Sequence, residues 1–210
     1  MTEESTVAAP SRGFRGRAGA TRDPRLPPGQ YDTGTDWPVL SAEPTPRLDT
    51  ATWTFTVEGL ARTPTTWTWE QITALPTSSY TGDIHCVTKW SKLGTKWQGV
   101  TIDHLIEAAG LDEPPAPYLM AYCDGGYTTN LPVEDLIDGK GMVATHYDGE
   151  PLAPEHGGPA RLLVPHLYFW KSAKWVRRLR FIEHDEPGFW ESLGYHIYGD
   201  PWREQRYAGD

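Results

Sequence analysis

The stretch "DIHCVTKW", residues Asp83 to Trp90, decides how this chain is interpreted. It places Cys86 directly after His85 and three residues before Lys89, and the chain has only one other cysteine. Neighbouring side chains on a strand point to opposite faces, so His85 is a poor direct partner for Cys86. A nearby lysine, or exposed backbone N–H groups, would favour the thiolate, the form that binds soft metals or attacks electrophiles. From these residues alone, Cys86 could be a metal ligand, a nucleophile or an inert core residue.

The composition of the whole chain narrows the class of protein. Its 210 residues suffice for one large domain or two small ones with a sizeable core. The formal net charge of -9 argues against nucleic acid as a partner, because phosphate binding needs a basic surface. No apolar run approaches the roughly 20 residues of a membrane helix, and residues 1–23 lack the apolar core of a signal peptide. We therefore expect a cytoplasmic protein without a membrane partner, in which Cys86 and Cys123 stay reduced and Cys123 is an inert core residue.

The order of sequence patterns predicts one domain behind a tail. Residues 1–36 are rich in Gly, Pro, Arg and Thr without a period, which predicts a flexible N-terminal tail. Residues 37–210 are expected to form a single domain, with the aromatic and polar stretch 188–210 wrapping over its body. Strands are predicted at 53–57, 118–122, 141–147, 161–164 and 175–182, and helices at 70–75, 100–110 and 131–137. This mixture predicts a strand-rich α+β fold.

A second segment, Gly149 to Leu179, has the character of an anion-binding loop. Gly- and Pro-rich loops can gather backbone N–H groups and cationic side chains around a phosphate. The cationic candidates are His156, Arg161, Lys171 and Lys174. The three arginines between residues 177 and 180 read as an ordinary charged strand face. The chain has no P-loop, no dinucleotide fingerprint and no paired Cys/His spacing for zinc.

At these two segments the sequence resembles the sulfite oxidase family of molybdenum enzymes, in particular its small bacterial members. It is also similar, more distantly, to the catalytic subunit of protein-methionine-sulfoxide reductase. The resemblance covers most of residues 37–182. Its marks are the cysteine segment with the following "WQGV" (Trp97–Val100) and the block "HGGPARLLVP" (His156–Pro165), running on to Lys174-Trp175. The resemblance implies a mixed, strand-rich sulfite-oxidase-like molybdopterin-binding fold.

The resemblance also implies a cofactor and its contacts. In the family, molybdenum is held by the dithiolene sulfurs of a pterin, by oxo or hydroxo groups and by one protein cysteine. Cys86 stands at the position of that cysteine, and thiolate suits a soft, redox-active metal. His156 and Arg161 match positions that grip the pterin and its phosphate. The other implied cofactor contacts are Leu40, Ser41, Ala42, Glu43, Asp124, Ser172, Ala173 and Lys174.

The sequence departs from true sulfite oxidases around the substrate. The residues directly after Cys86, Val87–Trp90, contain no arginine, and the position of the family's metal-side tyrosine falls near Pro187–Trp190. We therefore do not expect sulfite to be the substrate. The candidates for the rim of the substrate pocket are His85, Lys89, Trp90 and Lys92, of which Lys89 and Trp90 join Cys86 as catalytic candidates.

The function predicted on this basis is a molybdenum-pterin oxidoreductase. It would transfer an oxo group to or from a small substrate in a two-electron step and exchange single electrons with an external carrier. Two alternatives stay open at this point. The same fold could serve as a cofactor-free binding module, or Cys86 could act as the thiol of a metal-free enzyme.

Overall fold

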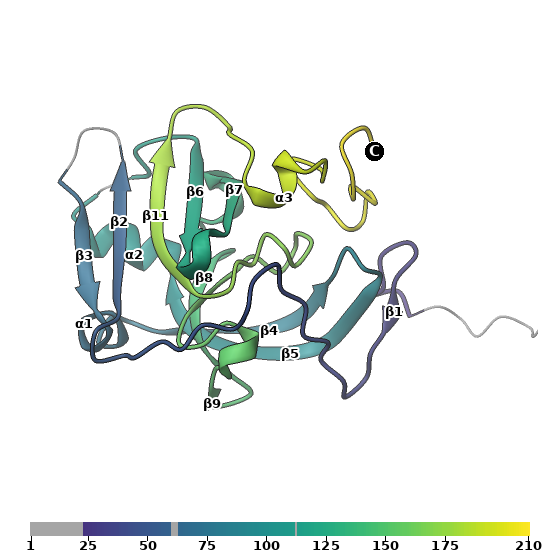
Figure 1. Cartoon of the computed structure of the whole chain (residues 1–210), viewed down its shortest axis with the longest axis horizontal. Helices are drawn as coiled ribbons and strands as arrows, with labels where there is room; N and C mark the ends of the chain where they lie inside the picture. The colour runs from purple at the N-terminus through teal and green to yellow at the C-terminus, as the bar shows by residue number, and fades with distance from the viewer. Residues whose placement is uncertain (1–22, 60–62, 112) are drawn as a thin grey trace, which may run out of the picture.

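The computed structural model describes residues 23–59, 63–111 and 113–210. Within them, two β-sheets carry most of the regular structure and the helices are short, which confirms the predicted strand-rich α+β class (Figure 1). The first sheet contains β1 (Tyr31–Asp32), β4 (Ser78–His85), β5 (Trp90–Thr101), β8 (Met142–Tyr147), β9 (Glu150–Pro151) and β10 (Arg161–Leu163). The second contains β2 (Thr54–Gly59), β3 (Thr65–Thr68), β6 (Tyr118–Cys123), β7 (Thr128–Pro132) and β11 (Val176–Ile182).

The helical elements lie between and beside the sheets. The α-helices are α1 (Trp69–Thr73), α2 (Ile102–Ala108) and α3 (Phe189–Ser192), and the 3-10 turns are η1 (Asp124–Gly126), η2 (Val133–Asp135) and η3 (Pro154–His156). Helix α1 begins with a capping box in which Thr68 and Gln71 each satisfy the other's backbone N–H. Helices this short are stabilised mainly by the sheets against which they pack.

One long strand organises each sheet. In the first, β5 pairs with β4, β8 and, in parallel, with β1. In the second, β11 lies between β2 and β6, parallel to β2 and antiparallel to β6. The alternation at Trp53, Phe55 and Val57 puts all three side chains into the larger apolar core. A smaller core cluster, which includes Cys86, Trp90, Trp97 and Phe169, lies under the first sheet and borders the site described below.

Gly99 is required where β5 meets β8. The register shifts between Gln98 and Gly99, and a Cβ at Gly99 would collide with the Val143 carbonyl on β8. A glycine therefore lets the two backbones approach closely at this bulge.

Two predicted helices differ from the structure. The helix expected from residue 100 begins at Ile102, because Val100 and Thr101 continue β5 and pair with β8, and Thr101 caps the helix. The helix expected over residues 131–137 is the end of β7 followed by the 3-10 turn η2. In both places, pairing with a neighbouring strand overrides the local helical pattern.

The N-terminal segment also differs from the predicted tail. Residues 1–22 lie outside the described residues, but residues 23–36 pack on the body. The Tyr31 backbone N–H donates to the Lys89 carbonyl at 2.9 Å, and β1 extends the first sheet beside β5. The Lys92 ammonium donates to the backbone carbonyls of Gly34, Thr35 and Asp36 at 3.1–3.2 Å. Many of these contacts use the backbone of the segment, which a composition-based prediction does not weigh.

The stretch 188–210 contains α3 and then runs without regular structure along one side of the molecule (Figure 1). Its residues contact β7 and the turn after β4, for example through the Ile197 carbonyl, which accepts from Asn130, and through Arg206, which donates to the Val87 carbonyl. None of the helices in the described residues is long and apolar enough to cross a membrane. The expected cytoplasmic location stays a prediction.

Candidate active site

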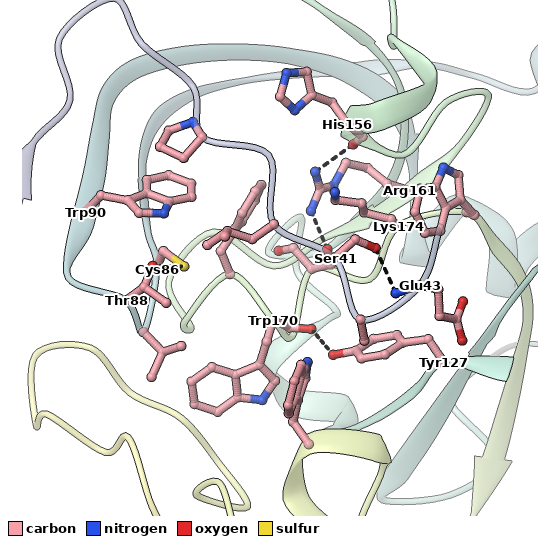
Figure 2. A pocket seen from close by; sticks show the side chains of 18 of the residues that line it. Ser41, Glu43, Cys86, Thr88, Trp90, Tyr127, His156, Arg161, Trp170 and Lys174 are labelled. Carbon is pink, nitrogen blue, oxygen red and sulfur yellow. Dashed lines mark hydrogen bonds between the residues drawn. The ribbon is translucent and has the colours of Figure 1, made fainter. Parts of the chain in front are cut away.

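A cavity of about 310 Å³ brings the two sequence segments together. Its wall is built from five parts of the chain that lie far apart in sequence (Figure 2). The lining residues are Trp37, Pro38, Leu40, Ser41, Ala42, Glu43, Cys86, Val87, Thr88, Trp90, Tyr127, His156, Arg161, Phe169, Trp170, Ser172, Lys174, Trp175, Trp190 and Tyr195. Cys86 thus faces a common space with His156, Arg161 and Lys174 of the second segment.

Cys86 lies at the start of the tight turn that joins β4 to β5. Its N–H donates to the Trp90 carbonyl at 2.8 Å, and its carbonyl accepts from the Lys89 N–H at 3.0 Å. The side chain is 8% exposed, and its Sγ accepts a hydrogen bond from Thr88 Oγ1 at 3.2 Å. Burial raises the pKa of the Cys86 thiol, while the Thr88 hydroxyl and the backbone N–H groups of Thr88 and Val87 oppose that rise. The Thr88 and Val87 groups, together with the more distant Arg206, are the ones that favour the thiolate here.

The lysine expected to favour the thiolate does not enter the cavity. Lys89 is exposed and adopts φ 77°, a left-handed conformation at the outer corner of the turn. Lys92 is buried, but its ammonium holds the carbonyls of residues 34–36 and does not line the cavity. Of the predicted rim residues, Trp90 lies in the wall, and its ring Nε1 is buried without a hydrogen-bond partner in the described part of the chain.

His85 points away from Cys86, as strand alternation predicted. Its Nδ1 lies 2.8 Å from Ser91 Oγ, and the ring is 5% exposed. Burial lowers the pKa of His85 to about 4, so the ring is neutral near pH 7. His85 is therefore a packed, neutral residue behind the cysteine turn, and it does not line the cavity.

Arg161 is the central cation of the opposite wall. It is 1% exposed, and its guanidinium donates to the carbonyls of His156, at 2.7 Å, and of Ser172. The planar group also lies over the Phe169 ring, 4.1 Å from its centroid. Its Nε has no hydrogen-bond partner, and among the described residues no carboxylate forms an ion pair with it. Burial lowers the pKa of Arg161 to about 9, which marks a cation held away from water without an anion beside it.

Two further basic groups, Lys174 and His156, lie near Arg161. Burial, and next the charge of Arg161, lower the pKa of Lys174 to about 8 and that of His156 to about 4. The Lys174 ammonium donates to the Glu155 carbonyl at 2.7 Å. Gly157, with φ 110°, lets the backbone pass close to Arg161 and Lys174, where a Cβ would be crowded. Arg161 and Lys174 together make a positively charged recess with the neutral His156 ring beside it, and a bound anion would offset that charge.

The segment 37–43 covers one side of the cavity. The Trp37 ring stacks on the His156 ring with centroids 3.7 Å apart and planes 8° from parallel. Leu40, Ser41 and Ala42, which the resemblance implies as cofactor contacts, line the cavity. Glu43 packs its carboxylate against Gly125, at a place where a Cβ would collide with it, and burial raises the pKa of that carboxyl.

Two predicted cofactor contacts, Ala173 and Asp124, do not line the cavity. Ala173 is buried, and its carbonyl accepts from the Leu162 N–H at 2.8 Å. Asp124 lies in a separate surface depression, with its Oδ2 3.6 Å from Arg177 Nε. Ser172, by contrast, lines the cavity, and its Oγ accepts from the Val164 N–H at 2.8 Å.

Lys171, the remaining cation of the second segment, has a different role. It is fully buried, and its ammonium lies 2.6 Å from Glu191 Oε1 and 2.8 Å from Asn130 Oδ1. Glu191 Oε1 also accepts from the Trp170 ring N–H at 2.9 Å. This ion pair joins the stretch 188–210 to the body behind the cavity wall.

An aromatic wall near Cys86 was missed by the sequence reasoning. Trp170 and Tyr195 meet edge to face at 5.3 Å, Trp190 and Tyr195 lie 4.9 Å apart, and all three line the cavity. Tyr127 joins them through its hydroxyl, which donates to the Trp170 carbonyl at 2.8 Å. The available signal was the density of aromatic residues in 188–210, but nothing local says which of them face inward.

The match to a known family decides the class of protein. The model of the oxidoreductase molybdopterin-binding domain matches residues 42–190. The chain belongs to this family. It is a molybdopterin-dependent oxidoreductase of the sulfite oxidase type, and its cofactor is molybdopterin with molybdenum.

The molybdopterin oxidoreductase has relatives of very different length. It is 45% identical over 187 residues to the uncharacterized oxidoreductase YuiH of Bacillus subtilis, covering 89% of this chain and 93% of that one. It is 29% identical to a putative protein-methionine-sulfoxide reductase subunit, YedZ1, of Azospira oryzae, covering 72% of this chain and 57% of the relative. Among solved structures it is similar to the sulfane dehydrogenase SoxCD of Paracoccus pantotrophus, with a TM-score of 0.60, 25% identity, and coverage of 67% of this chain and 40% of that chain.

The residues present in the oxidoreductase fit the cofactor. The buried Arg161, with an unpartnered Nε, is a ready partner for a phosphate. Within the described ranges, no group of three or more His, Cys, Asp and Glu side chains could hold a metal ion by itself. A metal carried by a pterin needs less from the protein, and among the described residues that line the cavity Cys86 is the one that offers a soft ligand.

Proposed function

We propose that Cys86 holds the molybdenum of this oxidoreductase, and that an oxo group is transferred there between water and a small, uncharged substrate. The balanced reaction is XO + 2 H⁺ + 2 e⁻ ⇌ X + H₂O, with the electrons exchanged singly with an external carrier. The observation that carries the proposal is that Cys86 Sγ and the uncompensated Arg161 guanidinium line one cavity.

Each wall of the cavity has a proposed part in holding the cofactor. Arg161, Lys174 and His156 hold its phosphate end, with Ser172 beside them. Residues Leu40–Glu43 cover the pterin from the solvent side, and Cys86 ligates the metal. When bound, the molybdenum supplies the two-electron oxo-transfer chemistry, while the chain supplies ligand, orientation and electrostatics.

The aromatic wall supports an uncharged substrate. Among the described residues that line the cavity, Arg161 is the single arginine, and it is committed to the cofactor side. The space near Cys86 is bounded by Trp90, Trp170, Trp190 and Tyr195, which offer ring faces and few charges. The buried Trp90 Nε1 is the donor that we assign to the oxygen of the substrate. An anion such as sulfite would lose its hydration there without gaining a cationic partner.

The names of the relatives point in the same direction. One is a putative subunit of a methionine-sulfoxide reductase and another is a sulfane dehydrogenase, so both act on sulfur compounds by name. A sulfoxide is an uncharged oxo donor of the size that the aromatic wall suits. We therefore extend the proposal to organic sulfoxides as the substrate class.

The test compares two substrates on protein purified from a host that makes the cofactor. With reduced viologen as electron donor, we expect reduction of dimethyl sulfoxide. With ferricyanide as acceptor, we expect sulfite oxidation with a kcat/KM lower by about tenfold or more, since tenfold corresponds to ~1.4 kcal/mol of lost stabilisation. Sulfite turnover that equals or exceeds sulfoxide turnover would contradict the substrate class.

The Cys86→Ser variant tests the role of the thiolate in the same assay. We expect turnover to fall by about 10³-fold or more, the scale of losing a group that touches the reacting atoms. Full turnover of a variant that still carries pterin would refute the assignment. Turnover by metal-free protein, lost on alkylation of Cys86, would instead support the thiol enzyme.

A further inference from the structure

The turn that carries Cys86 is held from outside by four separate donors. Each of four backbone carbonyls at the turn accepts a hydrogen bond from a distant segment. The pairs are Phe169 N–H to His85 at 2.8 Å, Gln30 Nε2 to Cys86 at 3.0 Å, Arg206 Nη1 to Val87 at 2.6 Å and Tyr31 N–H to Lys89 at 2.9 Å. Two of the donors are backbone groups, and two are side chains that a substitution can remove.

Gln30 reaches the cysteine itself. Its side chain is 7% exposed, and its Nε2 donates to the carbonyl of Cys86. Its Oε1 accepts from Ser91 Oγ at 3.3 Å, and Ser91 Oγ lies 2.8 Å from His85 Nδ1. A buried amide that is satisfied at both ends has one favourable orientation, so Gln30 ties the two strands on either side of the turn together.

Arg206 holds the next residue of the turn. It is 8% exposed, and its guanidinium donates to the carbonyl of Val87 and, at 3.2 Å, to that of Pro28. The carboxylate of Glu204 lies 3.9 Å from Arg206 Nη2, and the Glu204 side chain is 53% exposed. The buried guanidinium is thus used mainly on backbone carbonyls, and it joins three segments at the base of the turn.

We propose that Gln30 and Arg206 are positioning residues that fix the direction in which Cys86 presents its sulfur to the metal. The inference rests on the proposed role of Cys86 as the molybdenum ligand. Neither side chain lines the cavity, so each acts through the turn and not on the substrate. Groups that orient a metal ligand tune the electronic structure of the metal, and here they come from the two segments on either side of the family match.

The experiment uses Gln30→Ala and Arg206→Met, each in the full chain produced with cofactor. The first readout is the electron paramagnetic resonance signal of the one-electron-reduced molybdenum. We expect a single signal in the wild type and a shifted or split signal in both variants, because the sulfur then occupies more than one orientation. Arg206→Lys, which keeps one donor, should restore most of the wild-type signal.

The second readout does not depend on the metal. On the fraction of protein without molybdenum, the rate of Cys86 alkylation is followed by mass spectrometry of the peptide. We expect the alkylation rate, compared at equal thiolate fraction, to rise by about tenfold in both variants. Tenfold is the scale expected when one buried hydrogen bond that opposes local opening is lost. This readout tests the positioning role even if the proposed function fails.

Gln205→Ala is the matched control. Gln205 is 7% exposed on the same segment as Arg206, and its Oε1 accepts from the Asp200 N–H, away from the cysteine turn. Its signal and alkylation rate should equal those of the wild type. An unchanged signal and an unchanged rate in Gln30→Ala and Arg206→Met would overturn the proposal. Equal changes in Gln205→Ala would do the same, because they would indicate general loosening. If Gln30→Ala does not fold, the Arg206→Met and Arg206→Lys pair decides.

Discussion

Arg161 and Lys171 are two fully buried cations that lie ten residues apart. They differ in whether a carboxylate of the chain compensates their charge. Lys171 lies 2.6 Å from the carboxylate of Glu191, so its charge is compensated within the chain. Arg161 has no carboxylate partner in the described residues, and its Nε makes no hydrogen bond. A buried charge without a partner costs several kcal/mol. The comparison teaches that the charge of Lys171 is compensated within the chain, whereas that of Arg161 is not, which is why we propose an anion as its partner.

Removing Lys171 tests the compensated cation, and its effect on stability is the largest that we expect. Lys171→Met leaves Glu191 buried and charged, so the free energy of unfolding should fall by about 3–5 kcal/mol. Chemical denaturation measures the loss. The double variant Lys171→Met/Glu191→Leu removes both charges and should recover most of it. A double variant as unstable as the single one would show that the pair is not the source of the loss.

Removing Arg161 tests whether the uncompensated cation binds the cofactor. In Arg161→Ala, we expect the pterin content of purified, folded protein to fall by about 10- to 100-fold, because charge-assisted hydrogen bonds of about 1.5–3 kcal/mol are lost. Pterin fluorescence after oxidation measures the content. The stabilised double variant above serves as the control and should keep its pterin. Equal pterin in Arg161→Ala and the wild type would contradict the assignment of the anion site.

His156 sharpens the comparison through pH. Its pKa in the fold is about 4, lower than the ordinary value of 6.5 because of burial and the nearby cations. Below pH 6.5 the unfolded chain binds a proton that the folded chain does not, so this contribution to stability is lost as the pH falls from 6.5 towards 4. His156→Gln should reduce the pH slope of stability of the cofactor-free protein by about 1.4 kcal/mol per pH unit in that window. His85 has a similar lowered pKa, so part of the slope should remain. An unchanged slope in the variant would show that His156 is not held neutral.

Lys89 gives the smallest expected effect. It was a catalytic candidate from its spacing to Cys86, but its side chain is exposed at the corner of the turn. Lys89→Ala should change the stability by no more than about 0.5 kcal/mol and leave turnover within about twofold of the wild type. A large loss of turnover would restore the sequence-based assignment.

The residues of the cation-rich wall could be picked out from the sequence because they fall in one short block. His156, Arg161, Ser172 and Lys174 were identified together with the cysteine turn, and the structure brings them to one cavity. Charge and spacing alone could not separate Arg161 from Lys171, because the partner of Lys171 lies in the stretch 188–210. Compensation of a charge is a property of the fold, and local pattern does not report it.

The parts that the sequence missed depend on contacts between distant segments. The aromatic wall takes Trp170 from the cation block and Trp190 and Tyr195 from the stretch 188–210. The strand β1 (Tyr31–Asp32) forms because the edge of β5 offers backbone partners, although its own residues show no strand period. Likewise, Val100 and Thr101 pair with β8, although the helical pattern in the sequence begins with them.

The most direct test of the account is the number of sulfur neighbours at the metal. X-ray absorption at the molybdenum edge should find one more sulfur neighbour in the wild type than in Cys86→Ser, while the variant keeps pterin through Arg161 and Lys174. That result would place the Cys86 sulfur on the metal and the cationic recess on the other end of the cofactor. An equal sulfur count in both proteins, with both loaded with pterin, would contradict the central claim that Cys86 is the ligand.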